Sequence, residues 1–244
     1  MGELIALLSG KGGTGKTSVC AALATALAQS GEKVLCIDCD VGLRNLDISL
    51  GLTDHSALSF LDVCEGRYSL EQLEPHPDYP TLYFLTAPIN RHPEQIPELE
   101  FAQMLREARE HFDRILLDAP AGLDVGFRLA AKSADRIILV TGPDRAAIRD
   151  AARAGNELEL MGKTSVRLVV NRVNRKMVST MNLTIDDIMD EAGLPLLGVV
   201  PEDSGVVLAA AFDTPLLKYT NRGAAAACRR IARRLQGFRE PIRI

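Results

Sequence analysis

The sequence has no tryptophan, only four histidines, and no uninterrupted apolar run of the roughly 18 residues that a membrane-spanning helix requires. Its start lacks the basic segment followed by an apolar stretch that is typical of a secretory signal. The five cysteines are an odd number with mostly apolar neighbours, which argues against a disulfide framework and favours buried thiols in a reducing compartment. Since the histidines are not spaced like metal ligands either, these absences predict a cytoplasmic protein without a protein-bound transition metal.

The composition is that of an ordinary globular protein, with 244 residues of which 47% are hydrophobic and 25% are charged. No linker-like or low-complexity stretch divides the chain, so we expect one domain over residues 1–244. Short aliphatic segments alternate with longer alanine-rich segments, which predicts parallel strands joined by crossover helices. The expected fold class is therefore α/β, with a doubly wound, mostly parallel sheet and helices on both faces.

The alternation also predicts where the elements lie. The expected strands are 4–8, 33–38, 81–86, 114–118, 136–141, 166–171 and 196–200. The expected helices are 16–29, 97–110, 145–160, 184–190, 205–211 and 223–235. Segment 54–92 holds four prolines and is expected at the surface around an edge strand. Parallel sheets bind ligands beyond the carboxyl ends of their strands, so the loops that follow the strands form the expected site.

One of these loops has the pattern of a phosphate-binding loop. Residues 10–17 read Gly-Lys-Gly-Gly-Thr-Gly-Lys-Thr, which satisfies G-x-x-x-x-G-K-[ST] between an expected strand and an expected helix. Glycines let backbone amides approach a phosphate, and the N-terminus of the helix attracts the same anion. Lys16 can reach the β- and γ-phosphates, and the Thr17 hydroxyl can bind Mg²⁺. The residues expected to contact the nucleotide here are Gly10, Lys11, Gly12, Gly13, Thr14, Gly15, Lys16, Thr17 and Ser18.

Lys11 is a second cation in this loop, although Lys16 already serves the phosphates of the bound nucleotide. A second lysine is explained if it faces further negative charge, which the nucleotide of a partner subunit would supply in a face-to-face dimer. The pattern K-G-G-x-G-K-[ST] at residues 11–17 resembles the deviant Walker-A ATPases, the MinD/ParA family of P-loop NTPases. The resemblance implies that Lys11 reaches across an ATP-sandwiched homodimer. The alternative is a solvated lysine without a role.

Acidic residues follow two further strands. Residues 38–47 read Asp-Cys-Asp-Val-Gly-Leu-Arg-Asn-Leu-Asp, and the apolar strand 114–118 ends in Asp118. Carboxylates beside a triphosphate repel it unless Mg²⁺ or a proton intervenes, so they are candidates for metal binding or for positioning water. Asp118 stands where a Walker-B aspartate would hold Mg²⁺, although an aspartate that ends a strand can also be a simple turn former.

Segment 38–47 is also similar to the septum-site-determining (MinD) branch of the family. By that resemblance Asp40 orients the attacking water, Asp38 belongs to the outer shell of the metal, and Asn45 and Asp47 help to form a switch. A helix-capping role is the alternative for Asp47. The expected catalytic residues are Lys11, Lys16 and Asp40. The expected metal-binding residues are Thr17, Asp38 and Asp118.

The resemblance further implies that the ends of two later strands flank the adenine ring. An asparagine amide there can pair with the exocyclic amine and a ring nitrogen of adenine. The expected base-contacting residues are Asn171, Arg172, Pro201, Glu202 and Asp203. Asparagine before a loop is common, so this expectation depends on the resemblance.

The function implied by the resemblance is an ATP-hydrolysing dimerisation switch that helps to place the division septum, with ATP and Mg²⁺ as cofactors. Its implied partners are a MinC-like inhibitor and a MinE-like or other activator. A ParA-like DNA-partitioning ATPase and a flagellar-number ATPase are the alternatives within the family. DNA binding needs a basic face. Such a charge excess is found in residues 222–244, which carry +6 against −10 for the rest of the chain, so DNA is less favoured.

The C-terminal segment 223–238 predicts a basic amphipathic helix with Cys228, Ile231, Leu235 and Phe238 on one stripe. The stripe either packs on the sheet as the last helix of the domain or lies on anionic lipid. Members of the MinD branch usually continue beyond this helix into a short amphipathic anchor. We therefore expect either that an anchor has been removed or that this member binds membrane weakly or through a partner. The expected location is the cytoplasm, with peripheral association at the inner face of the cell membrane.

Overall fold

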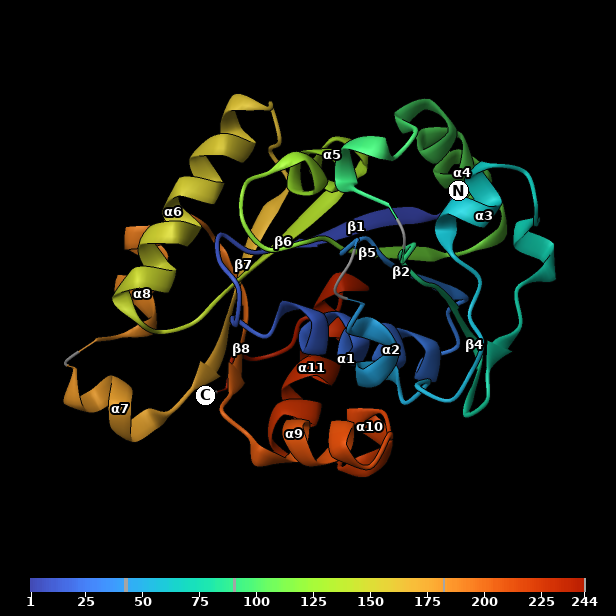
Figure 1. Cartoon of the computed structure of the whole chain (residues 1–244). Coiled ribbons are helices and arrows are strands. Elements are labelled where there is room, and N and C mark those ends of the chain that lie inside the picture. Colours follow the sequence, from blue (N-terminus) through green and yellow to red (C-terminus); the bar gives the residue numbers. More distant parts are fainter. Residues whose placement is uncertain (42–43, 90, 182, 244) are drawn as a thin grey trace.

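The computed structural model describes residues 1–41, 44–89, 91–181 and 183–243, which form one sheet covered by helices on both faces (Figure 1). The strands are β1 (Glu3–Leu8), β2 (Val34–Asp38), β3 (Pro75–His76), β4 (Tyr79–Leu85), β5 (Arg114–Asp118), β6 (Arg136–Thr141), β7 (Val166–Val173) and β8 (Leu196–Pro201). Their order in the sheet is β3-β4-β2-β5-β1-β6-β7-β8, and each neighbouring pair is parallel except β3 with β4. The expected mostly parallel α/β fold is confirmed.

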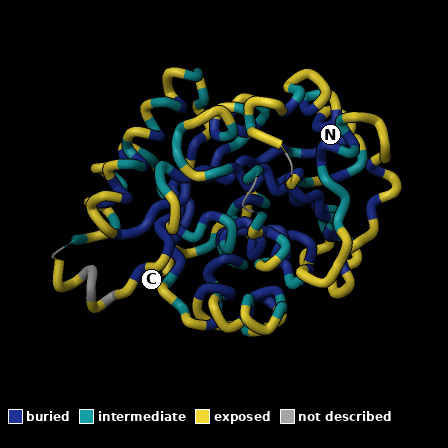
Figure 2. Tube along the Cα trace, in the orientation of Figure 1, coloured by how far each residue is buried: buried dark blue, intermediate teal, exposed yellow. Residues whose placement is uncertain are grey.

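The helices form two layers, each with its own part of the core. One face of the sheet is covered by α1 (Lys16–Gln29), α2 (Leu46–Leu50), α9 (Ser204–Ala211), α10 (Leu216–Tyr219) and α11 (Gly223–Leu235). The other face is covered by α3 (Phe60–Cys64), α4 (Glu98–His111), α5 (Val125–Ser133), α6 (Arg145–Leu160) and α8 (Ile185–Ala192). The remaining helical segments are α7 (Arg175–Thr180) and the 3-10 turns η1 (Leu70–Gln72) and η2 (Pro93–Gln95). The buried trace of the sheet runs between these layers (Figure 2).

The sheet interior explains why the sequence pattern predicted it well. Strands β5 and β6 are apolar almost throughout and are buried on both faces, as crossover helices on both sides require. Helix α1 is buried nearly all round because it packs between the sheet and helices α2 and α11. The register places Asp38 beside Asp118 at the carboxyl ends of β2 and β5. The fold therefore brings the two predicted acidic segments together.

Most of the expected boundaries agree with the structure, and the differences have physical reasons. Helices α1, α6 and α11 and strands β5 and β6 have the expected bounds. Helices α2, α3, α7 and α10 were not predicted, because four to six residues are too short to show a helical period. The nine-residue α5 was also missed. The two-residue strand β3 pairs with β4 at the edge of the sheet, within the irregular segment expected there.

The last helix packs into the domain. Cys228, Ile231 and Leu235 of α11 are buried against the sheet, so the packing interpretation holds for them and their side chains are not available to lipid. Phe238 follows the helix and is 54% exposed, with the Arg233 guanidinium over its ring. Within the described residues, every helix is too short or too polar to cross a bilayer.

Candidate functional site

A buried ion pair lies at the base of the phosphate-binding loop. The Nζ of Lys16 is 2.5 Å from Oδ1 of Asp118, and the two side chains are 6% and 1% exposed. Burial on its own lowers the pKa of Lys16, but the charge and hydrogen bond of Asp118 outweigh it and the pKa is raised. The loop thus holds a fixed positive charge at the N-terminus of α1, where an anion is also favoured by the helix.

The second oxygen of Asp118 is the feature that fits a metal ion. Oδ2 is buried and has no hydrogen-bond partner among the described residues. An unpaired buried carboxylate oxygen is costly, and carboxylate and hydroxyl oxygens are the ligands that Mg²⁺ prefers. The Thr17 hydroxyl lies close by, 3.5 Å from the Lys16 ammonium. These donors fit the predicted Mg²⁺ site.

Asp38 organises the segment that follows β2. Its carboxylate accepts hydrogen bonds from the backbone N–H groups of Asp40 (2.8 Å), Asn45 (3.2 Å) and Leu46 (3.2 Å). Burial and the neighbouring Asp118 raise the pKa of Asp38 to about 7, although the backbone hydrogen bonds oppose the shift. A carboxylate that already accepts three hydrogen bonds fits an outer-shell role better than direct metal binding.

Asp40 lies nearer the mouth of the site and is half-buried. Burial raises the pKa of Asp40, the charge of Lys16 opposes this shift, and the charge of Asp118 adds to it. The backbone N–H of Asp40 donates a hydrogen bond to Asp38, which pairs with Asp118 across β2 and β5, so Asp40 follows directly on the acidic end of the site. Residues 42 and 43 of the same acidic motif lie outside the described residues.

Helix α2 begins inside the acidic motif. Asn45 occupies the N-cap position, so Asp47 lies in the first turn and accepts a hydrogen bond from the Ile48 N–H at 2.8 Å. Asp47 is therefore not the N-cap residue of α2, and the helix-capping alternative for it is wrong. Arg44 was missed by the sequence argument: its φ of +39° is rare for a non-glycine residue, and its buried Nε has no partner among the described residues.

Lys11 has a counter-ion in its own chain. Its Nζ is 3.0 Å from Oδ1 of Asp144, and the two side chains are 35% and 52% exposed. The carboxylate of Asp144 also caps α6 by accepting a hydrogen bond from the Ala147 N–H at 2.9 Å. The sequence pattern predicted the nucleotide of a partner subunit as the counter-charge of Lys11, and Asp144 of the same chain was missed. An aspartate directly before an expected helix was the available signal.

A cavity of about 440 Å³ opens beside the loop and holds all five residues expected to contact the base. Asn171 and Arg172 come from the end of β7, Pro201 is the last residue of β8, and Glu202 and Asp203 follow it. The Asp203 carboxylate accepts hydrogen bonds from the first turns of both α9 and α11, so it shapes the wall. The apolar part of the lining was not predicted: it consists of Val19, Val200, Val206, Val207, Leu216, Ala224 and Cys228. An apolar slot with few polar groups suits a planar ring.

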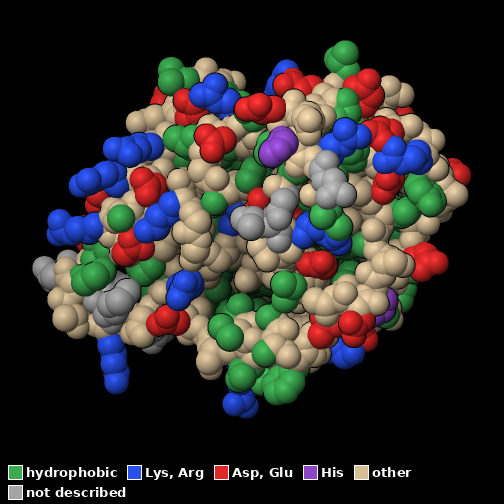
Figure 3. All heavy atoms as spheres, viewed as in Figure 1, with side chains coloured by type: hydrophobic (Ala, Val, Ile, Leu, Met, Phe, Trp, Pro, Cys, Tyr) green, Lys and Arg blue, Asp and Glu red, His purple; other side chains and the backbone are tan. Residues whose placement is uncertain are grey.

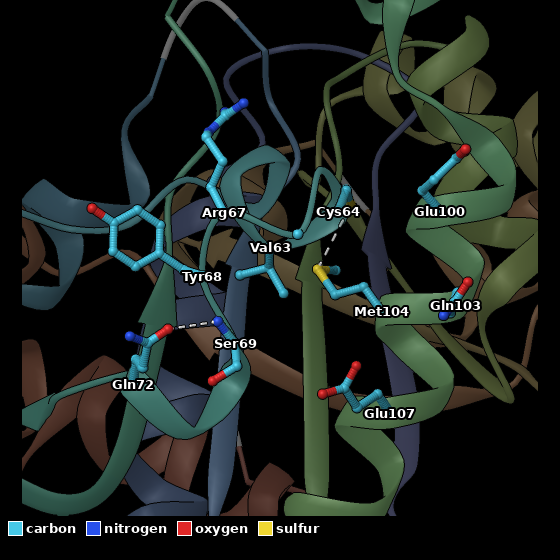
Figure 4. Close-up of a pocket in the computed structure, with 11 residues that line it drawn as sticks. Val63, Cys64, Arg67, Tyr68, Ser69, Gln72, Glu100, Gln103, Met104 and Glu107 are labelled. Carbon is cyan, nitrogen blue, oxygen red and sulfur yellow. Dashed lines mark hydrogen bonds between the residues drawn. The ribbon is translucent and has the colours of Figure 1, made fainter.

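A second cavity, of about 430 Å³, lies between α3, the segment after it, and α4 (Figure 4). Glu100 and Glu107 of α4 line one side of it, and Arg67 and Tyr68 line the other with side chains that point away from α4. Arg67 is paired with Asp62 at 2.5 Å. No residue predicted for the nucleotide site lines this cavity.

The family model described as the CobQ/CobB/MinD/ParA nucleotide binding domain matches residues 5–216, which is most of the chain. The septum site-determining protein MinD of Bacillus subtilis is 36% identical over 248 residues, covering 100% of this chain and 92% of the relative. The MinD of Thermotoga maritima is 37% identical, covering 99% and 91%.

Solved structures agree with these relatives. A chain of the MinC:MinD cell division protein complex of Aquifex aeolicus superposes with a TM-score of 0.91 at 36% identity, covering 99% of this chain and 98% of that one. MinD of Pyrococcus horikoshii complexed with Mg-ADP gives 0.84 at 30% identity, covering 96% of each chain. The chain therefore belongs to the MinD family of septum site-determining ATPases. Its function is MinD-like placement of the division site, and a ParA-like role is not favoured.

Proposed function

We propose that this chain is a Mg²⁺-dependent ATPase switch whose ATP-bound form dimerises and whose dimer activates hydrolysis. The observation that carries the proposal is the buried pair of Lys16 and Asp118, with its free carboxylate oxygen, beside a cavity that gathers the expected base contacts. The MinD of Pyrococcus horikoshii, which superposes on this chain, binds Mg-ADP. That precedent supports ATP and Mg²⁺ as the cofactors here.

The residues divide the work by their positions. With a nucleotide bound, Lys16 would exchange its contact with Asp118 for the β- and γ-phosphates, and Thr17 and Asp118 would hold Mg²⁺. The chemistry that a bound Mg²⁺ would supply is neutralisation of the phosphate charge and orientation of the phosphates. Asp38 holds the following segment in place through its backbone hydrogen bonds. Asp40, half-buried near Lys16, orients the attacking water.

Lys11 provides the link to a second subunit. Its pair with Asp144 is exposed, and exposed ion pairs contribute only about 0–1 kcal/mol. Lys11 can therefore leave Asp144 at little cost when a partner's triphosphate, with its larger charge, approaches. We infer that Lys11 makes this exchange in the ATP-bound homodimer.

The partners follow from the relatives and from the surface. MinD of Aquifex aeolicus forms a complex with MinC, so a MinC-like inhibitor is the first proposed partner, and a MinE-like activator is the second. Basic side chains gather along α6 (Figure 3), where Arg145, Arg149 and Arg153 are exposed one turn apart. This stripe suits an acidic segment of a partner.

A membrane surface is the third proposed partner. Exposed Phe238 and Ile242 lie among arginines in the C-terminal segment, a combination that suits an anionic lipid surface. DNA is less favoured, because Arg229 and Arg234 of α11 already donate hydrogen bonds to backbone carbonyls and Arg233 is paired with Glu240.

The test is co-sedimentation of the chain with anionic vesicles or with DNA, in the presence of Mg-ATP or Mg-ADP, beside light scattering of the chain alone. We expect dimers and vesicle binding with ATP and neither with ADP. Salt-sensitive DNA retention without vesicle binding would instead favour the partitioning role. Monomers in saturating ATP, with hydrolysis blocked, would refute the switch.

A further inference from the structure

Strand β7 contains an irregularity beside the phosphate-binding loop. Val170 pairs with Val199 and Val173 pairs with Pro201, so Asn171 and Arg172 of β7 face a single residue of β8. This is a β-bulge, a feature that re-aims side chains and is common next to active sites. Arg172 has a φ of +58°, a strained conformation for a non-glycine residue that persists only where the surroundings hold it.

The bulge directs both side chains onto the phosphate-binding loop. The Nδ2 of Asn171 donates a hydrogen bond to the carbonyl of Thr14 at 2.8 Å, and this contact is buried. The Arg172 guanidinium donates to the carbonyl of Gly13 at 3.2 Å. In a regular strand, consecutive side chains point to opposite faces, so both could not reach the same loop. The bulge is what brings two consecutive residues onto two consecutive carbonyls.

Gly15 leaves the space that the Asn171 side chain needs for this contact. A Cβ at Gly15 would lie 2.3 Å from the Nδ2 of Asn171, and Gly15 has a φ of +81°. Any side chain at this position would displace the Asn171 amide from the loop and strain the backbone. The glycine is thus needed for the contact with β7 as well as for the approach of a phosphate.

The direction of the carbonyls decides what the loop offers to an anion. In a trans peptide the C=O and the following N–H point in opposite directions. Holding the carbonyls of Gly13 and Thr14 on the side of β7 therefore turns the N–H groups of Thr14 and Gly15 to the opposite side of the loop. Successive N–H groups that point the same way form an anion-binding concavity.

We propose that Asn171 and Arg172 are positioning residues of the phosphate-binding loop. They hold the carbonyls of Gly13 and Thr14, which keeps the Thr14 and Gly15 amides aimed at the phosphates before the nucleotide arrives. Both residues also line the base cavity. A base bound there therefore holds the two side chains against the loop and strengthens phosphate binding through them. The inference rests on the proposed nucleotide site and adds a role to residues expected only to touch the base.

The test separates phosphate binding from base binding by using inorganic tripolyphosphate, which has no base, beside Mg-ATP. Calorimetric titration of Asn171→Ala should show an affinity for tripolyphosphate that is about five- to tenfold weaker than that of the unmodified chain, as loss of a buried hydrogen bond implies. The affinity for Mg-ATP should fall by at least as much. Val207→Ala is the matched control, because Val207 lines the same cavity from α9. It should weaken Mg-ATP and leave tripolyphosphate unchanged.

Hydrogen exchange of the ligand-free chain gives a second readout. The amides of residues 13–15 should exchange faster in Asn171→Ala than in the unmodified chain, and Arg172→Lys should restore part of the binding that Arg172→Ala loses. Asn171→Ala could instead weaken the affinity for Mg-ATP and leave both the tripolyphosphate affinity and the hydrogen exchange unchanged. That result would mean that Asn171 contacts only the base, and it would overturn the positioning role. Failure of the unmodified chain to bind either ligand would overturn the proposed function instead.

Discussion

The two lysines of the phosphate-binding loop lie in opposite environments. Lys16 is buried with a buried partner, whereas Lys11, five positions earlier, pairs with Asp144 at the surface. Coulomb attraction is strong in the interior and is screened by water and salt at the surface. The buried pair is therefore broken only when a bound phosphate replaces Asp118 as the partner of Lys16, whereas the exposed pair can be broken at little cost. One short motif thus supplies both a permanent charge and a movable one.

The largest expected effect is at the buried pair. Lys16→Ala leaves Asp118 buried without its counter-ion, which should lower the free energy of unfolding by about 3–5 kcal/mol and abolish Mg-ATP binding. Urea unfolding and calorimetric titration measure the two effects. In the double variant Lys16→Met with Asp118→Leu, most of the stability should return while binding stays absent. A folded single variant that keeps tight ATP affinity would remove Lys16 from the phosphate site.

The next effect concerns Asp40, which belongs to neither pair. Asp40→Ala should reduce phosphate release by about 100-fold or more, as expected for loss of a group that positions water, while the ATP-bound dimer persists. Single-turnover phosphate release and light scattering are the measurements. Asp40→Asn keeps the size of the side chain without its charge and serves as the control. Normal turnover in Asp40→Ala would exclude the residue from hydrolysis.

A smaller effect on stability is expected at the exposed pair. Lys11→Ala should change the free energy of unfolding by no more than about 1 kcal/mol, because the pair with Asp144 is screened by solvent. The same variant should bind Mg-ATP and remain monomeric, as shown by light scattering. If Lys11→Ala lowered the free energy of unfolding as much as Lys16→Ala, the contrast between the two lysines would be wrong. If Lys11→Ala still formed the full amount of dimer with Mg-ATP, Lys11 would have no role across the subunits.

The smallest effect is expected away from the loop, at His76. Its Nδ1 accepts a hydrogen bond from the Asp78 N–H, so the neutral ring donates from Nε2 to the carbonyl of Leu50 at 2.7 Å. Burial lowers the pKa of His76 below its usual 6.5, while the Leu50 contact and Asp78 oppose the shift and Lys218 and His55 add to it. Its contribution is complete above pH 6.5 and is lost as the pH falls through the lower folded-state pKa, because the unfolded chain then binds the extra proton.

The comparison variant for this prediction is His76→Asn, which has a donor but does not titrate. Urea unfolding between pH 5 and pH 8 should show a shallower pH dependence for this variant than for the unmodified chain. Equal slopes would mean that other groups set the pH dependence of the free energy of unfolding in this range.

The sequence predicted those features that are local along the chain. The phosphate-binding loop and the ends of β5 and β6 are continuous segments whose spacing and hydrophobicity point to one structure. The partners of the site residues were not predictable in this way. Asp144 lies 133 positions from Lys11, and Asn171 lies 157 positions from the Thr14 carbonyl that it contacts. Such contacts depend on strand order and on a bulge, neither of which leaves a periodic signal.

The base cavity shows the same limit. Its polar residues were named through family resemblance, but its apolar wall comes from β8 and from helices α1, α9, α10 and α11, which meet only in the folded chain. The hydrogen bonds that Asp203 accepts from both α9 and α11 could not be predicted from the sequence either.

The two edge strands of the sheet, β3 and β8, limit how copies of this chain can associate. At one rim, β3 is two residues long and begins with a proline, which cannot donate a ladder hydrogen bond. At the other, the Leu197 carbonyl of β8 is already bonded to Arg234 at 2.6 Å. Strand addition, which leads to lasting polymers, is therefore discouraged at both rims. The homodimer that we propose would instead form through side chains and bound nucleotide, so it could be undone each time a phosphate is released.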